Sequence, residues 1–157
     1  MSAYKTIKTQ MTNANILRIA LEQAKPEWAG HIEVPEPGKS ITIRGDSSLK
    51  GELVVKKGHA GTYSDIGVVR AKDGSLSWKI SDVDDGSYYR DAESRKQKGK
   101  LFDKEWQTSM AAEYGVVERA QEVAAAGAQI GQRQVFNHPQ WGQVIGVRCR
   151  IKKSAVV

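Results

Sequence analysis

The chain has 157 residues, 39% of them hydrophobic and 27% charged, which suits one globular domain with a core of its own. Its single cysteine excludes an intrachain disulfide and a zinc site built on thiolates, and it fits a reducing compartment, so we expect a cytoplasmic protein. No window approaches the roughly 20 apolar residues of a membrane span, so we expect no membrane partner. The formal net charge of +6 favours an anionic partner, although a solvated basic surface explains the same balance.

The first predicted elements are a short strand over residues 4–9 and an amphipathic helix. Thr12 or Asn13 is placed to cap the helix, because both side chains can accept a hydrogen bond from an N–H group of its first turn. Pro26 ends the helix. Its apolar residues recur at helical spacing on one face: Ile16, Leu17, Ala20, Leu21 and Ala24. We expect this face to pack on a sheet or on another helix.

The middle of the chain predicts strands joined by turns. Three of the four prolines lie in residues 26–40, where Pro-Glu-Pro-Gly at 35–38 predicts a rigid connection. Residues 45–48 are expected to form a turn or short loop. Four strands are expected, around residues 41–43, 53–55, 64–70 and 76–81. The last two form a hairpin, because Lys-Asp-Gly-Ser at 72–75 contains a glycine that tolerates the positive φ of a tight turn.

The C-terminal half predicts a long helix and two more strands. Residues 86–100 are basic and lack apolar periodicity, so we expect either a mobile basic loop or an exposed extension of the next helix. The helix runs over residues 103–126, with Gly127 as its C-terminal cap. A strand over residues 129–136 follows. In the last strand two sets of residues face opposite ways: Ile145, Val147, Cys149 and Ile151 against Arg148, Arg150 and Lys152.

The predicted order of elements is β-α-β-β-β-β-α-β-β. Helices inserted among hairpins indicate an α+β fold, with one antiparallel or mixed sheet and both helices on one of its faces. We expect the whole chain, residues 1–157, to form this single domain.

The acidic segment Asp-Val-Asp-Asp-Gly at 82–86 has the composition of a calcium loop. Such a loop needs glycine at its sixth position. Here Gly86 is the fifth residue from Asp82, so the register is wrong and we expect a strand-end turn with solvated carboxylates. The spacing of the three histidines predicts no metal site, no cofactor is implied, and no catalytic residue is evident.

The small-residue loop between the strands at 53–55 and 64–70 is a candidate anion site. Backbone N–H groups of such a loop can cradle a phosphate, although this one lacks the Gly-Lys-Ser/Thr ending of a nucleotide-binding P-loop. A plain flexible connection explains the same composition. The candidate ligand-binding residues here are Lys57, His59, Gly61, Thr62, Tyr63 and Ser64.

The last strand supplies a second candidate site. Arg148 and Arg150, followed by Lys152 and Lys153, form a basic stripe that can contact phosphates together with the cations at 95–100. A solvent-facing sheet surface explains the same pattern. The aromatic residues are expected to be committed to the helices and hairpins, so no stacking platform for single-stranded nucleic acid is predicted.

Three segments together resemble one protein family. They are Lys-Thr-Ile-Lys-Thr at 5–9 before a capped helix, Ser-Asp-Ile-Gly at 64–67 with Asp73-Gly74 and Ile-Ser-Asp-Val-Asp at 80–84, and the long helix with Trp106, Tyr114 and Val117 before two strands. The family is an uncharacterised domain of unknown function that includes a conserved hypothetical reading frame of cyanobacteria and algal plastids, with bacterial and phage relatives. The resemblance implies an accessory role beside AAA-type ATPases and transfers no catalytic residue. This chain departs from the family pattern around Pro35 and near Lys96.

Two classes of function follow from these observations. The first is a non-enzymatic binding or adaptor protein that acts through a protein partner or self-association, for example as an accessory to an AAA-type ATPase. The second is a binding module for an anionic ligand, either nucleic acid or a nucleotide, and a phage-encoded protein that sequesters a nucleotide signal belongs to this class. An enzyme ranks third, because no nucleophile–base pair or metal cluster is evident.

Overall fold

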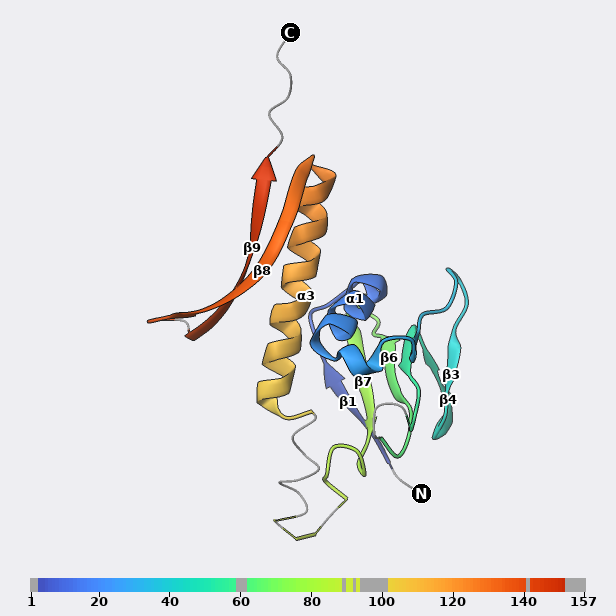
Figure 1. The fold of residues 1–157 in the computed structure, drawn as a ribbon. Coiled ribbons are helices and arrows are strands. Elements are labelled where there is room, and N and C mark those ends of the chain that lie inside the picture. The colour runs from blue at the N-terminus through green and yellow to red at the C-terminus, as the bar shows by residue number, and fades with distance from the viewer. Residues whose placement is uncertain are drawn as a thin grey trace.

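The structure, a computed structural model, describes residues 3–58, 62–88, 90–91, 93, 102–140 and 142–151 (Figure 1). In these ranges the strands form a five-stranded antiparallel sheet, in the order β1-β7-β6-β5-β2, and two separate hairpins. The sheet contains β1 (Tyr4–Lys8), β2 (Ile32–Glu33), β5 (Leu53–Val55), β6 (Ile66–Arg70) and β7 (Leu76–Ser81). The hairpins are β3 (Ile41–Ile43) with β4 (Asp46–Gly51), and β8 (Ala128–His138) with β9 (Gly142–Ile151).

The first helix, α1 (Ala14–Ala24), begins where Asn13 supplies its cap. The Oδ1 atom of Asn13 accepts hydrogen bonds from the N–H groups of Asn15 and Ile16, at 3.0 and 3.1 Å. A short 3-10 helix, η1 (Pro26–Trp28), follows because proline cannot continue the α-helix. The predicted apolar face is buried, with Ile16, Leu17, Ala20 and Leu21 in the core. The predictions of a cap at Asn13 and of an end before Pro26 are therefore confirmed.

The long helix, α3 (Lys104–Ala125), packs against α1. The Tyr114 hydroxyl joins the two helices, because it accepts hydrogen bonds from the N–H groups of Thr12 and Asn13, at 3.3 and 3.0 Å. Gly127 ends α3 with a φ of +91° and donates its N–H to the carbonyl of Ala124, as the sequence predicts. Neither helix, in the part of the chain that the structure describes, has the length and apolar character that a membrane crossing needs.

The core lies between the helices and one face of the sheet. Strands β6 and β7 turn alternate residues toward the helices, and these are fully buried: Ile66, Val68, Leu76, Trp78 and Ile80. Trp78 meets Trp106 of α3 edge-on, with ring centroids 5.3 Å apart. Both helices therefore cover one face of the sheet, and the predicted β6–β7 hairpin contributes the centre of the core.

The opposite face of the sheet is covered by the β3–β4 hairpin. Ile43 of β3 is completely buried and sits over Gly67 of β6. A Cβ atom on Gly67 would overlap the Ile43 side chain, so only glycine leaves room for this close approach. The sheet is consequently buried on both faces at its centre.

The β8–β9 hairpin, called the ribbon below, is attached to the outer side of α3 (Figure 1). Its strands pair from Ala128 opposite Ile151 to His138 opposite Gly142, with a shift of register between Ile130 and Arg133. Ile145 and Val147 of β9 line an apolar depression against α3. Toward its tip the ribbon curves away from α3, on the side opposite the sheet (Figure 1).

The predicted α+β class is confirmed, as is the position of both helices on one face of an antiparallel sheet. The strands do not form the one sheet that was expected, because β3–β4 and β8–β9 pair only as separate hairpins. Two short strands were not predicted. Residues 45–48, expected as a turn, contain the start of β4, and β2 lies in the Pro-rich stretch. Both strands are short and carry little apolar alternation, so pairing with a neighbour rather than local pattern creates them. The predicted basic loop at 86–100 lies mostly outside the described residues.

Candidate functional site

The loop predicted to bind an anion joins β5 to β6. Lys57 and Tyr63 are exposed, whereas Thr62 and Ser64 are buried. His59 and Gly61 lie outside the described residues. Two strand ends thus hold the described part of the loop close to the sheet, and only its charged and aromatic side chains reach solvent.

Two aspartates accept hydrogen bonds from the N–H groups of Lys57, Tyr63 and Ser64 in this loop. Asp84 accepts hydrogen bonds from the N–H groups of Tyr63 and Ser64, at 2.6 and 3.1 Å. Asp65, which is 1% exposed, accepts one from the N–H of Lys57 at 2.8 Å and another from the N–H of Arg44 at 2.8 Å. A phosphate at this position would therefore compete with the Asp84 carboxylate, which already makes the bonds that the anion needs.

The acidic turn after β7 is a strand-end turn, as predicted, but its carboxylates are not simply solvated. Besides the loop, Asp84 accepts a hydrogen bond from the Ser81 hydroxyl at 2.8 Å. Asp85 pairs with Lys5 of β1 at 3.0 Å. Burial acts to raise the pKa of Asp85, but hydrogen bonds from Ser87 and the Lys5 ammonium hold it below its usual value. The turn therefore links the end of β7 to β1 and to the loop.

The second predicted site lies on β9. Ile145 and Val147 face α3, so Arg148 and Arg150 face the opposite way, by the alternation of side chains along a strand. Both arginines are exposed. Residues two apart on one face of a strand are separated by about 7 Å. We call this side of the hairpin the outer face of the ribbon.

An exposed aromatic ring shares the outer face with the arginines. Phe136 is opposite Val144 in the register, and Gly146 is opposite Gln134, which places these residues on the side of Arg148. Phe136 is 51% exposed. A Cβ atom on Gly146 would lie 3.1 Å from Phe136 Cε1, so the glycine leaves the space into which the ring lies. Phe136 lies in a hairpin, as expected for the aromatic residues, but its ring is not packed in a core, and Tyr63 and Tyr88 are also exposed outside any helix or strand.

The outer face is basic because the C-terminal segment has no acidic residue. Residues 128–157 contain no Asp or Glu. Their cations are Arg133, Arg148, Arg150, Lys152 and Lys153. The side chain of Arg133 and the two lysines lie outside the described residues, but the charge of the segment follows from the sequence alone. The presence of cations without any acidic residue distinguishes this segment in the sequence. The signal appears only when acidic and basic residues are considered together.

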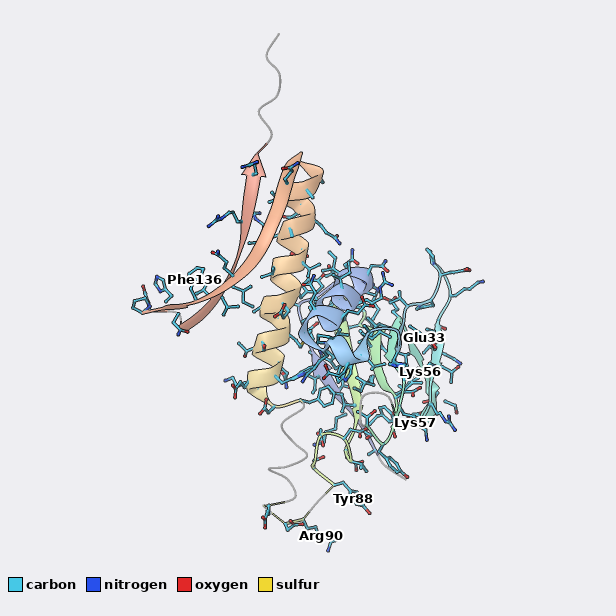
Figure 2. All side chains as sticks on the ribbon, viewed as in Figure 1. Glu33, Lys56, Lys57, Tyr88, Arg90 and Phe136 are labelled. Atoms are coloured by element: carbon cyan, nitrogen blue, oxygen red, sulfur yellow. The ribbon has the colours of Figure 1, made fainter. Side chains whose placement is uncertain are left out.

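The two predicted sites are not brought together. Lys57 lies at the far side of the five-stranded sheet from the ribbon that carries Phe136 (Figure 2). Arg148 and Arg150 therefore cannot share one small ligand with Lys57, Thr62, Tyr63 and Ser64. Within the ranges that the structure covers, no three His, Cys, Asp or Glu side chains gather closely enough to hold a metal ion.

Comparison of the chain with protein-family models, curated proteins and solved structures finds no match. The resemblance to an uncharacterised family stays a prediction, and the functional argument therefore depends on the geometry of the site.

Proposed function

We propose that this chain is a non-enzymatic binding protein that holds single-stranded nucleic acid on the outer face of the ribbon. The observation that carries the proposal is the combination, on one exposed strand face, of Arg148, Arg150 and the half-exposed ring of Phe136. Arginines bind phosphate oxygens in a bidentate manner, and an aromatic ring provides a surface on which an unpaired base can stack. These are the two components of a sequence-tolerant single-strand site.

The shape and charge of the ribbon support the same ligand. A strand of ten residues spans about 34 Å, which is long enough to follow several nucleotides. No carboxylate within residues 128–157 repels the phosphates. The loop with Lys57 is less suited to an anion, because Asp84 takes the N–H groups of Tyr63 and Ser64.

The test measures binding of a fluorescent 20-nucleotide single strand by anisotropy, at several salt concentrations. The double variant Arg148→Gln/Arg150→Gln should bind at least tenfold more weakly. Its salt dependence should be shallower by about 1.4 in the slope of log K against log salt, because two phosphate contacts are lost. Phe136→Ala should weaken binding by about five- to 150-fold without changing this slope, since stacking on one base contributes about 1–3 kcal/mol.

The matched control removes the same charge elsewhere. Lys72 and Lys104 are exposed and lie outside the ribbon, so Lys72→Gln/Lys104→Gln should bind nearly as the wild type does. The proposal is overturned if the lysine variant loses as much affinity as the arginine variant, because a general basic charge then explains binding. Tighter binding of a duplex of the same sequence would also contradict the role of Phe136.

The second candidate is the adaptor function. The observation that favours it is the apolar depression of about 320 Å³ between α3 and β9. Its walls include Ala112, Gly115, Val116, Val123, Ile145 and Val147. A protein partner or a second copy of the chain can cover such a surface. Native mass spectrometry distinguishes the two functions, since an adaptor gives a stable oligomer or protein complex with no bound oligonucleotide.

A further inference from the structure

A cavity of about 930 Å³ lies between α1 and the Pro-rich segment that follows β2. Its volume is within the range of sites that hold small organic ligands. Its lining residues come from α1, from residues 32–41 and from the edge of the sheet, so it is separate from the ribbon. Neither the predicted sites nor the proposed function includes this cavity.

Most charges around this cavity already have partners. Glu52 is held by the guanidinium of Arg70 at 2.6 Å, and Glu36 by Lys39 at 2.8 Å. Glu33 is paired with Lys56 at 3.4 Å. The three carboxylates are therefore compensated inside the protein. Arg70 is also bonded to the carbonyl oxygens of Thr12 and Gly74, so it has a structural role.

Arg18 is the exception among the charged residues of the cavity wall. Its Nε atom is buried and has no hydrogen-bond partner among the residues that the structure describes. None of the ion pairs between described residues includes Arg18. The Arg18 side chain as a whole is only half-buried and lines the cavity, and no carboxylate among the described residues pairs with it, so a ligand carboxylate can reach its charge.

The start of α1 adds little to this charge. The N–H groups of Asn15 and Ile16 are already bonded to the Asn13 side chain. The remaining wall is largely apolar, with Ile32 buried and Val34 and Ile41 half-buried. The cavity thus offers one cation without an ion-pair partner among the described residues, beside apolar side chains. Glu33, Glu36 and Glu52 also line it and would repel a ligand that carries a second negative charge.

We propose that this cavity binds a monocarboxylate with an apolar body, whose carboxylate pairs with the Arg18 guanidinium. The planar guanidinium matches a carboxylate with two parallel hydrogen bonds. The apolar part of the ligand packs on Ile32, Val34 and Ile41. A single negative charge is selected because Arg18 is the only unpaired cation that the described part of the cavity wall provides.

The test uses hexanoate as the probe, titrated into the isotope-labelled full chain and followed by amide NMR. We expect saturable shifts at Val34 and Ile41. Hexanol, which has the same apolar body without the charge, should bind at least tenfold more weakly, since a charge-assisted hydrogen bond contributes about 1.5–3 kcal/mol. Inorganic phosphate should bind more weakly than hexanoate, because it lacks the apolar body.

Arg18→Met keeps most of the side-chain volume and removes the charge. Hexanoate should bind to it at least tenfold more weakly, whereas Arg18→Lys should retain part of the affinity. Arg119→Met removes an exposed arginine of α3 and should bind hexanoate as the wild type does. The thermal midpoint of Arg18→Met should equal or exceed that of the wild type, because the variant no longer buries an unsatisfied donor.

Three results would overturn the proposal. The first is the absence of saturable shifts at Val34 and Ile41. The second is equal affinity for hexanoate and hexanol, or an unchanged affinity in Arg18→Met. The third is tighter binding of inorganic phosphate than of hexanoate, which would make the cavity a phosphate site.

Discussion

The five-stranded sheet and the ribbon are both built from antiparallel strands, yet their side chains differ in how far they are buried. In the sheet, Trp78 is 2% exposed because the helices cover one face and Ile43 approaches the other at Gly67. In the ribbon, α3 covers only the side of Ile145 and Val147, and Phe136 remains 51% exposed. The same strand pattern therefore gives a buried core or an exposed face according to what covers it.

The two regions also differ in how their polar groups are satisfied. Around the sheet, buried or half-buried carboxylates take up N–H groups of the neighbouring loops, as Asp65 and Asp84 do. The ribbon has no carboxylate with which to do this. Its positive charge is therefore available to an external anion. Variants of the two regions test this difference.

The first prediction compares two aromatic truncations. Trp78→Ala should lower the free energy of unfolding by about 3–5 kcal/mol, because it opens a cavity in the core beside Trp106. Phe136→Ala should change it by at most about 0.5 kcal/mol, since the ring lies on an exposed strand. Urea unfolding of both variants measures the difference.

Trp78→Phe provides a milder form of the first change, in case Trp78→Ala does not fold. It should lose less stability than Trp78→Ala and still more than Phe136→Ala. Equal losses at positions 78 and 136 would mean that the ribbon is as well packed as the sheet, and the distinction between the two regions would be wrong.

The second prediction concerns the hydrogen bonds that the Asp84 carboxylate accepts. Asp84→Ala should cost about 1–3 kcal/mol, because the N–H groups of Tyr63 and Ser64 and the Ser81 hydroxyl lose their acceptor. Asp73→Ala is the matched control. Asp73 also bonds to backbone and hydroxyl groups, but in an exposed turn at Ser75, so its loss should cost at most about 0.5 kcal/mol.

Hydrogen exchange would locate the effect of Asp84→Ala. Faster exchange is expected at Tyr63 and Ser64, with the ribbon unchanged. A stability loss in Asp84→Ala no greater than that in Asp73→Ala would contradict the structural role of the turn.

The third and smallest effect is a dependence on alkaline pH. Burial raises the pKa of Tyr4 to about 12, and the Asp65 carboxylate adds to this shift. The neutral hydroxyl donates to the carbonyl oxygens of Arg44 and Asp65, at 3.2 and 3.0 Å. Because the folded pKa lies above the unfolded value of 10.0, this contribution is complete below pH 10 and is lost as the pH rises toward about 12.

Tyr4→Phe should therefore be less stable than the wild type at neutral pH, by roughly 1 kcal/mol, with the difference shrinking between pH 10 and 12. Tyr63→Phe removes a hydroxyl from a side chain that is 66% exposed and should keep the wild-type pH profile. Urea unfolding at a series of alkaline pH values checks both. A Tyr4→Phe difference that stays constant with pH would refute the assignment.

Much of the fold follows from local pattern. The apolar spacing of α1, its Asn13 cap, the Gly127 end of α3 and the β6–β7 hairpin were all predictable, because each depends on residues close together in the sequence. Strands β2 and β4 were not. Strand β2 pairs with β5, more than twenty residues away in the sequence, and β4 pairs with β3 in a local hairpin. The residues of β2 and β4 carry little apolar alternation, so neither pairing leaves a periodic signal.

The candidate site was partly predictable for the same reason. Alternation along β9 places Arg148 and Arg150 on one face without any tertiary information. The exposure of Phe136 required the structure, since nothing in its local sequence indicates that the ribbon curves away from α3 (Figure 2). The bonds from Asp84 to the loop join residues about twenty positions apart, and the cavity at Arg18 brings together α1 and the Pro-rich segment. Neither contact has a local signature.

The carboxylate of Asp84 acts, in effect, as a permanent intramolecular inhibitor of the loop between β5 and β6. A group tethered beside its acceptors competes at an effective concentration that reaches the millimolar range. A dilute phosphate monoanion therefore cannot displace it by mass action. Asp84 thereby fixes the backbone of Tyr63 and Ser64 just before β6. The Asp84 carboxylate thus takes the place of the phosphate that this loop was predicted to bind.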